Sequence, residues 1–190
     1  MNPRSTSRET ILETCRAIVR ERGIAGINVR SVASACGVAP GTLYNYFPGK
    51  EALVLAVTAD VWSDILSLDA KKDMCGDEKD FASHVERAFQ SAQAGMARYP
   101  GFLPAHVLGL TKERDQRSEG KEMMQAFIGR LESSMLSALE SDNGVREDAF
   151  DGGLTKEGLA ELVTQQLISL LVLGRGDCKA LVAMIRKLLY

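Results

Sequence analysis

Apolar residues recur along this chain at spacings of three and four positions, the period of an amphipathic α-helix. The first such segment is predicted to begin near Thr6, with Glu9 completing a Thr-x-x-Glu capping box, and to end before Gly23. Ile11 and Val19 belong to its inner face. Polar stretches separate these apolar stripes, and no alternation of apolar and polar residues typical of strands is present. The sequence therefore predicts helices that pack on one another.

The rest of the chain follows the same pattern. A long apolar stripe with no break predicts a helix over residues 50–68, and polar stretches at 69–79 and 142–153 predict loops. A shorter apolar segment is expected up to residue 110, and a charged connector at 112–120. Further helices are predicted at residues 80–97, 121–141, 155–173 and 177–189. The fold class is therefore all-α, with about nine helices in all.

Residues 28–53 contain two short helical patterns separated by a glycine turn. Asn28 can cap a helix over 29–36, and Gly37 can end it in the left-handed conformation that glycine adopts without strain. Pro40 suits the first turn of a second helix, and from Gly41 to Phe47 its inner face would carry Leu43 and Phe47. This order of elements is typical of a helix-turn-helix that reads double-stranded DNA.

The charge along the chain agrees with this interpretation. The net charge is −2, but residues 1–50 hold seven basic and three acidic side chains. The remainder holds 16 basic and 22 acidic side chains. The N-terminal part can therefore approach a phosphate backbone while the acidic remainder is repelled by it, which favours one orientation on DNA.

The phrase from Val38 to Leu53, VAPGTLYNYFPGKEAL, closely resembles the signature of the tetracycline-repressor (TetR) family of bacterial regulators. The resemblance covers residues 8–55. Asn28 stands where the family usually has Thr, and Ala39 and Gly49 stand where Ser is common. A missing side-chain cap at Ala39 weakens the second helix by about 1 kcal/mol. The resemblance implies a helix-turn-helix domain at 1–50 and a helical effector-binding and dimerisation domain at 51–190.

The expected DNA contacts lie mainly on the outer face of the second short helix. Hydroxyl, amide and ammonium groups there can bond to phosphates or base edges, and a glycine permits close approach. Tyr44, Tyr46 and Lys50 are expected on phosphates, and Thr42 and Asn45 on bases. The alternative, that these aromatic residues fill a core, is weaker because positions 44, 46 and 47 cannot all face one side of a helix. The predicted set is Arg30, Gly41, Thr42, Tyr44, Asn45, Tyr46 and Lys50.

The last two predicted helices carry apolar residues over more than one face, so part of that surface is expected to meet a second copy of the chain. In the resembled family the final two helices form a dimer interface, and a two-fold dimer suits near-palindromic DNA. A monomer with an enclosed C-terminal hairpin is the alternative. The predicted interface residues are Leu162, Gln166, Leu170, Leu181, Ile185 and Leu188.

The middle of the chain is rich in aromatic and methionine side chains, which suit an irregular apolar or amphipathic effector but can equally fill a core. In the resembled family a bound effector shifts the long helix that begins at Lys50 and weakens DNA binding. The predicted pocket residues are Phe89, Met96, Phe102, His106, Met123 and Phe127.

Other chemistries find little support in the sequence. The two histidines and four cysteines have no metal-ligand spacing, and no nucleophile motif, phosphate loop or dinucleotide fingerprint is present. We therefore expect no enzyme activity, cofactor or metal, with a redox role of Cys75 left open. Without a signal peptide or a long apolar run, a cytoplasmic protein without membrane contact is expected.

The main prediction from the sequence is thus a homodimeric repressor that binds operator DNA and is released by a ligand. Two alternatives remain. One is an architectural or division-associated DNA-binding protein of the same fold. The other is a helical ligand-binding protein without promoter control.

Overall fold

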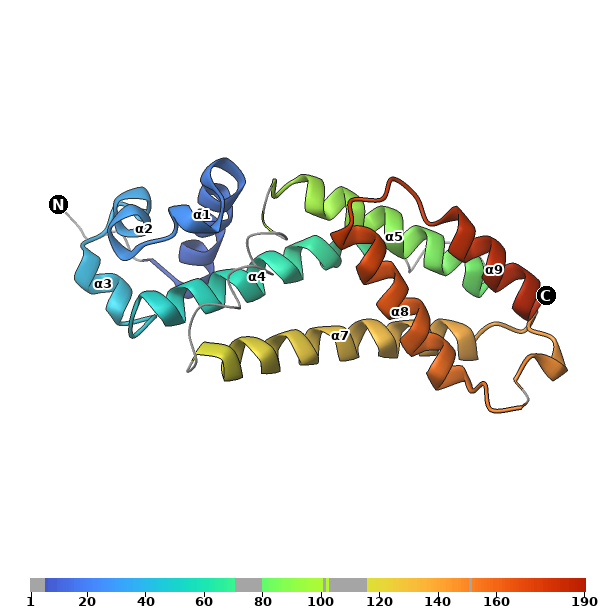
Figure 1. Ribbon diagram of the computed structural model, residues 1–190. Helices are drawn as coiled ribbons and strands as arrows, with labels where there is room; N and C mark the ends of the chain where they lie inside the picture. The colour runs from blue at the N-terminus through green and yellow to red at the C-terminus, as the bar shows by residue number, and fades with distance from the viewer. Residues whose placement is uncertain (1–5, 71–79, 101, 103–115, 151) are drawn as a thin grey trace. The chain divides into compact units, whose positions relative to one another are not determined.

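The computed structural model describes residues 6–70, 80–100, 102, 116–150 and 152–190, with the side chains of 66–70 and 116–121 excepted. These ranges contain eight α-helices and no strand, which confirms the all-α prediction for the described part of the chain (Figure 1). Short 3-10 turns lie at Ile24–Gly26 and Glu147–Ala149. The helices are α1 (Arg8–Arg22), α2 (Val29–Cys36), α3 (Pro40–Tyr44), α4 (Lys50–Ala70), α5 (Phe81–Ala97), α7 (Gln116–Glu140), α8 (Lys156–Val172) and α9 (Lys179–Leu189).

The first helix is capped by the residue after the predicted one. The N-cap of α1 is Ser7, whose hydroxyl accepts a hydrogen bond from the Thr10 amide at 3.2 Å. Thr6 and Glu9 therefore do not form the predicted capping box. Two neighbouring hydroxyl residues can both serve as caps, and the extended backbone of Ser7 decides between them.

The chain divides into two compact units that do not follow the predicted domain boundary. Unit 1 comprises residues 1–67 and 95–120, and unit 2 comprises residues 68–94 and 121–190. The helix-turn-helix therefore shares a compact unit with most of α4 and with the end of α5. The division into functional domains at residue 50 stays a prediction.

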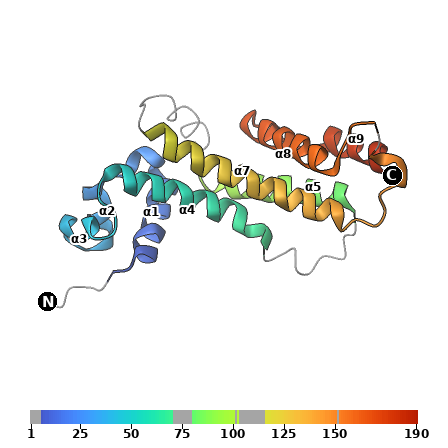
Figure 2. The ribbon, with the colours of Figure 1, turned by 90° about the horizontal axis from the view of Figure 1, so that it is seen from below.

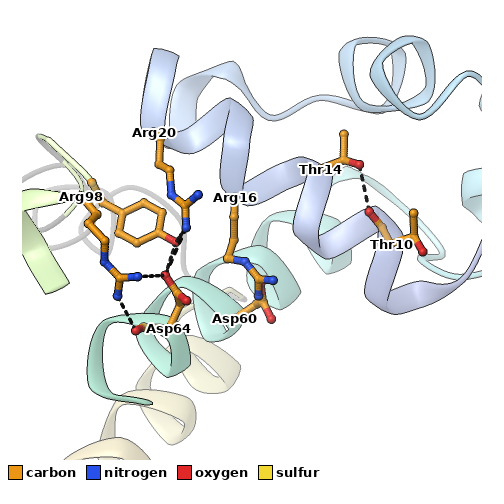
Figure 3. A network of polar contacts seen from close by, with 8 residues as sticks. Thr10, Thr14, Arg16, Arg20, Asp60, Asp64 and Arg98 are labelled. Carbon is orange, nitrogen blue, oxygen red and sulfur yellow. Dashed lines mark hydrogen bonds and ion pairs between the residues drawn. The ribbon is translucent and has the colours of Figure 1, made fainter. Parts of the chain in front are cut away.

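The interior of unit 1 is built from the inner faces of α1 and α4. Ile11, Cys15 and Val19 of α1 are fully buried. So are the apolar residues of one side of α4: Leu53, Val57, Val61 and Ile65. At the edge of this interior, Arg16 of α1 forms an ion pair of 2.7 Å with Asp60 of α4 (Figure 3). One turn further along both helices, Arg20 approaches Asp64 at 3.4 Å. Apolar burial and two ion pairs therefore join these helices.

Unit 2 has its own core, to which α5, α7, α8 and α9 all contribute (Figures 1 and 2). A buried carboxylate closes one end of it. Asp142 accepts hydrogen bonds from the Tyr190 hydroxyl and from the amides of Phe81 and Gly144. Burial disfavours the charge of Asp142, but these donors outweigh it and lower its pKa below the usual range. The segment that follows α7, the start of α5 and the end of the chain are thereby held together.

Within unit 1, α5 crosses α4 at a glycine. A Cβ atom at Gly95 would lie 2.4 Å from the backbone oxygen of Ile65 and 3.0 Å from its Cα atom. No side chain fits at that distance from backbone atoms, so the two helices approach each other as closely as they do because residue 95 is glycine.

We expect Gly95→Ala to lower the free energy of unfolding by about 1–3 kcal/mol, because the helices must separate to admit the methyl group. Urea denaturation measures the change. Gly129→Ala in α7 is the matched control: a Cβ there meets nothing within 4 Å, so it should be neutral or stabilising by up to about 1 kcal/mol. An unchanged midpoint for Gly95→Ala would contradict the close crossing.

Candidate nucleic-acid interface

Both ends of α2 are fixed by local hydrogen bonds, as the sequence predicts. The Asn28 side chain accepts from the Ser31 amide at 2.9 Å, and the Ser31 hydroxyl accepts from the Asn28 amide at 3.3 Å. At the other end, Gly37 has a left-handed backbone (φ 68°), and the Val38 amide bonds to the Ala33 oxygen at 3.0 Å. This geometry fixes the direction in which the chain enters the turn before α3.

The second short helix, α3, begins as predicted and ends earlier. Pro40 occupies its first turn, and Ala39 provides no side-chain cap. The helix ends at Tyr44 rather than at Phe47, and the chain continues as a turn in which the Phe47 amide bonds to the Leu43 oxygen at 2.9 Å. Leu43 and Phe47 are both buried, as expected for the inner face.

The predicted DNA-contacting residues lie at the surface of unit 1. Tyr44 is 54% exposed although it is a large aromatic residue. Thr42 and Tyr46 are half-buried, and the other five are exposed: Arg30, Gly41, Tyr44, Asn45 and Lys50. Of the predicted residues that belong to α3, Gly41 and Tyr44 are exposed and Thr42 is half-buried. Their individual contacts with DNA remain predictions.

Tyr46 has a structural contact that the sequence does not reveal. Its hydroxyl donates a hydrogen bond of 2.6 Å to the backbone oxygen of Thr6. Nearby in the same unit, the Arg8 guanidinium lies 5.3 Å from the centre of the Phe47 ring. The segment before α1 is thereby attached to the residues that follow α3. Because the partners are 40 positions apart, no local sequence signal could have found this contact.

Comparison with known proteins identifies this arrangement. Residues 11–57 match the family model for bacterial regulatory proteins of the tetR family. The HTH-type transcriptional regulator UidR of Escherichia coli (strain K12) is 37% identical over 51 residues, 27% of this chain and 26% of UidR. The N-terminal part of the chain is therefore similar to the DNA-binding part of tetR-family regulators. The aligned part spans about a quarter of the length of UidR.

Solved structures extend the likeness in fold along nearly the whole chain. FadR from Bacillus subtilis in complex with stearoyl-CoA superposes with a TM-score of 0.61 at 15% identity, covering 96% of this chain and 97% of FadR. The TetR-family regulator PfmR from Thermus thermophilus gives a TM-score of 0.54 at 17% identity, covering 97% of this chain and 95% of PfmR. At these identities the comparison establishes the fold.

The residues predicted to line an effector pocket are distributed over both units of the chain. In unit 1, Phe102 is buried with its ring centre 5.5 Å from that of Trp62, and Met96 is half-buried. In unit 2, Phe89 belongs to the core, Phe127 is buried and Met123 is half-buried. His106 lies outside the described residues, as do Cys75 and the apolar segment from 103 to 110.

The residues predicted at the dimer interface are divided between core and surface. Leu181 and Ile185 belong to the core of unit 2, where they contact residues of their own chain. Leu170 and Leu188 are half-buried, while Leu162 and Gln166 are exposed. Leu162 and Gln166 are therefore the members of the predicted set that lie at the surface of unit 2.

The described residues contain no cluster of potential metal ligands. None of their helices is both long and apolar enough to cross a membrane.

We expect Tyr46→Phe to release the start of α1, because it removes the hydroxyl that binds Thr6. The cost should be about 0.5–1.5 kcal/mol in unfolding free energy, with faster amide hydrogen exchange in residues 6–10. Tyr44→Phe removes the same group from an exposed side chain and serves as the control. Equal exchange rates in the two variants would show that the Tyr46 hydroxyl does not hold this segment.

Proposed function

We propose that this protein is a transcriptional regulator of the TetR family that binds operator DNA through α2, the turn at 37–39 and α3. The observation that carries the proposal is the division of α3 into two faces. Leu43 and the nearby Phe47 are buried, while the exposed side carries Tyr44, Asn45 and the backbone of Gly41. A firmly held helix with a polar outer face suits insertion into the major groove.

Phosphate contacts position the protein on DNA, and base contacts select the sequence. We assign Tyr44 and Lys50 to phosphates. Thr42 and Asn45 are assigned to base edges, since an amide can pair with adenine through two hydrogen bonds. The Tyr46 hydroxyl has a single proton and donates it to the backbone oxygen of Thr6. It could donate to a phosphate only by giving up that hydrogen bond. We therefore assign Tyr46 to positioning α1.

A homodimer is proposed from the outer face of α8 and α9. Leu162 and Leu173 are 58% and 65% exposed, and Met184 is 53% exposed. Large apolar side chains exposed on two consecutive helices of one unit are typical of a protein–protein contact. A two-fold dimer would present two copies of α3 and thus read a near-palindromic operator.

We further propose that DNA release is controlled by an apolar or amphipathic effector, which makes the protein a repressor that a ligand inactivates. The FadR structure of similar fold contains stearoyl-CoA, a molecule with a long apolar chain. In the present chain, Trp62 of α4 forms an aromatic cluster with Tyr99 and Phe102, which follow α5. An effector preferring the non-binding conformation by about 1–3 kcal/mol would change operator occupancy.

The DNA assignment is tested by selecting bound duplexes from a random library and measuring affinity at several salt concentrations. Lys50→Ala should weaken binding to all sequences and reduce the salt slope by about one unit. Asn45→Ala should instead change the preferred base at one position of each half-site, with a loss of about 1–3 kcal/mol for the original base. Lys179→Ala, a lysine of unit 2, is the control and should do neither.

Gly41→Ala sharpens this experiment. A Cβ at residue 41 would meet no atom of the chain within 4 Å, so the variant should fold as well as the parent. A loss of DNA affinity would then report on the approach of DNA to α3. If all these variants retain both affinity and sequence preference, the proposed docking is wrong; if the parent protein enriches no sequence, the proposed regulator function is wrong.

The dimer is tested by sedimentation at micromolar concentration. We expect the mass of two chains for the parent protein and of one chain for Leu162→Glu, because the introduced carboxylate would be buried without a partner. Gln90→Glu adds the same charge on an exposed face of α5 and should leave the dimer intact. A single-chain mass for the parent protein would exclude the homodimer.

A further inference from the structure

Three segments of unit 1 meet at one carboxylate, the side chain of Asp64 on α4. The Tyr99 hydroxyl, in the turn after α5, donates to Asp64 Oδ2 at 2.5 Å. Arg98 approaches the same oxygen at 3.1 Å and donates to the Asp64 backbone oxygen at 2.7 Å (Figure 3). Arg20 of α1 lies 3.4 Å from Asp64 Oδ2. We call this group of four residues, Arg20, Asp64, Arg98 and Tyr99, the Asp64 junction.

Tyr99 also connects α1 to the end of α5 directly. Arg20 donates to the Tyr99 hydroxyl at 3.1 Å, and its guanidinium lies 5.1 Å from the centre of the Tyr99 ring. Only 2% of the Tyr99 residue surface is exposed. The phenol therefore accepts from α1 and donates to α4 within a largely buried setting, where hydrogen bonds are less screened by water.

The electrostatics favour one protonation state of the junction. Burial disfavours the charge of Asp64, but the Tyr99 hydrogen bond and the guanidinium groups of Arg98, Arg16 and Arg20 lower its pKa below the usual range. Burial, together with the bond to Asp64, raises the pKa of Tyr99. At neutral pH a charged carboxylate and a protonated phenol thus hold the two guanidinium groups in place.

The other ion pair between α1 and α4 offers a direct comparison. Arg16 and Asp60 join the same two helices one turn away, through a bond of 2.7 Å. That pair can fix α1 on α4, but it contains no group from the end of α5. What distinguishes the Asp64 junction is the participation of Arg98 and Tyr99.

The close crossing at Gly95 makes the junction sensitive to the position of α5. Gly95 contacts Ile65, the residue that follows Asp64, with no room for a Cβ atom. Arg98 and Tyr99 follow Gly95 within about one turn, with the Arg98 amide bonded to the Gly95 oxygen at 3.2 Å. A shift of the end of α5 against α4 must therefore move Arg98 and Tyr99 relative to Asp64 and Arg20.

We propose that the Asp64 junction couples the position of the α5 end to the placement of α1, and through α1 to the DNA-contacting surface. The inference rests on the proposed DNA-binding function. A ligand or mutation that displaces the end of α5 then changes the DNA affinity, because the Tyr99 hydroxyl is hydrogen-bonded to both Arg20 of α1 and Asp64 of α4. Without that hydroxyl, the same displacement has little effect on α1.

A double-mutant cycle in the full-length protein tests the coupling. Gly95→Ala displaces α5 from α4, and Tyr99→Phe removes the hydroxyl but keeps the ring. The cycle is read out by the Kd for the selected operator and, independently of DNA, by hydrogen exchange of α1 amides. We expect Gly95→Ala to change the Kd by about fivefold or more in the parent background and less than about twofold in the Tyr99→Phe background.

Asp60→Asn is the matched control, since it breaks an ion pair between α1 and α4 without removing any bond to α5. In that background the effect of Gly95→Ala should persist at its full size. If Gly95→Ala does not fold, Phe102→Leu replaces it, because Phe102 packs against Tyr99 with ring centres 6.3 Å apart. The change in α1 exchange caused by the displacing variant should likewise disappear with Tyr99→Phe.

Equal effects of the displacing variant in the parent and Tyr99→Phe backgrounds would overturn the proposal. So would loss of the effect with Asp60→Asn, because the junction would then be no more than one of two contacts joining α1 to α4. If the parent protein binds no DNA, the proposed function fails, and hydrogen exchange alone still decides whether α5 and α1 are coupled.

Discussion

The five residues of α3 are too few to form a stable helix in water, so the recognition segment depends on tertiary burial. Leu43 and Phe47 supply it, being almost completely enclosed. Pro40 lowers the cost of starting the helix, while Ala39 contributes no cap. The exposed groups of α3 are therefore positioned by the interior of unit 1 and by the turn at Gly37. Since α3 packs on α2, and α2 on α1, a movement of α1 can change where those groups point.

The sequence predicted those features whose cause is local. Asn28, Gly37 and Pro40 each act within a few residues of their own position. In the structure Asn28 caps α2, Gly37 ends α2 in the left-handed conformation, and Pro40 lies in the first turn of α3. The first helix was misplaced because two adjacent hydroxyl residues carry the same signal. The end of α3 was misplaced because an apolar residue four positions after Leu43 looks the same in a helix and in a turn that folds back on the core.

Long-range contacts were out of reach of the pattern. The bonds from Tyr46 to Thr6 and from Arg20 to Tyr99 join residues 40 and 79 positions apart. Hydrophobic periodicity also could not say which apolar face of α9 packs within its own chain. Ile185 satisfies the periodicity as well as Met184 does, yet Ile185 is buried and Met184 is exposed. Both the long-range hydrogen bonds and the buried face of α9 depend on residues that are distant in sequence and meet only in the folded chain.

The chain has a single tryptophan, Trp62, which lies on α4, the helix that carries Asp64. Its ring makes an edge-to-face contact with the ring of Phe102. Trp62 is 9% exposed, so its emission depends on packing around the end of α5 more than on bulk solvent. The protein thus contains an intrinsic fluorophore two residues from the carboxylate at which α1, α4 and α5 meet. Rearrangement there can be followed optically in the unlabelled protein, without DNA and before any effector is known.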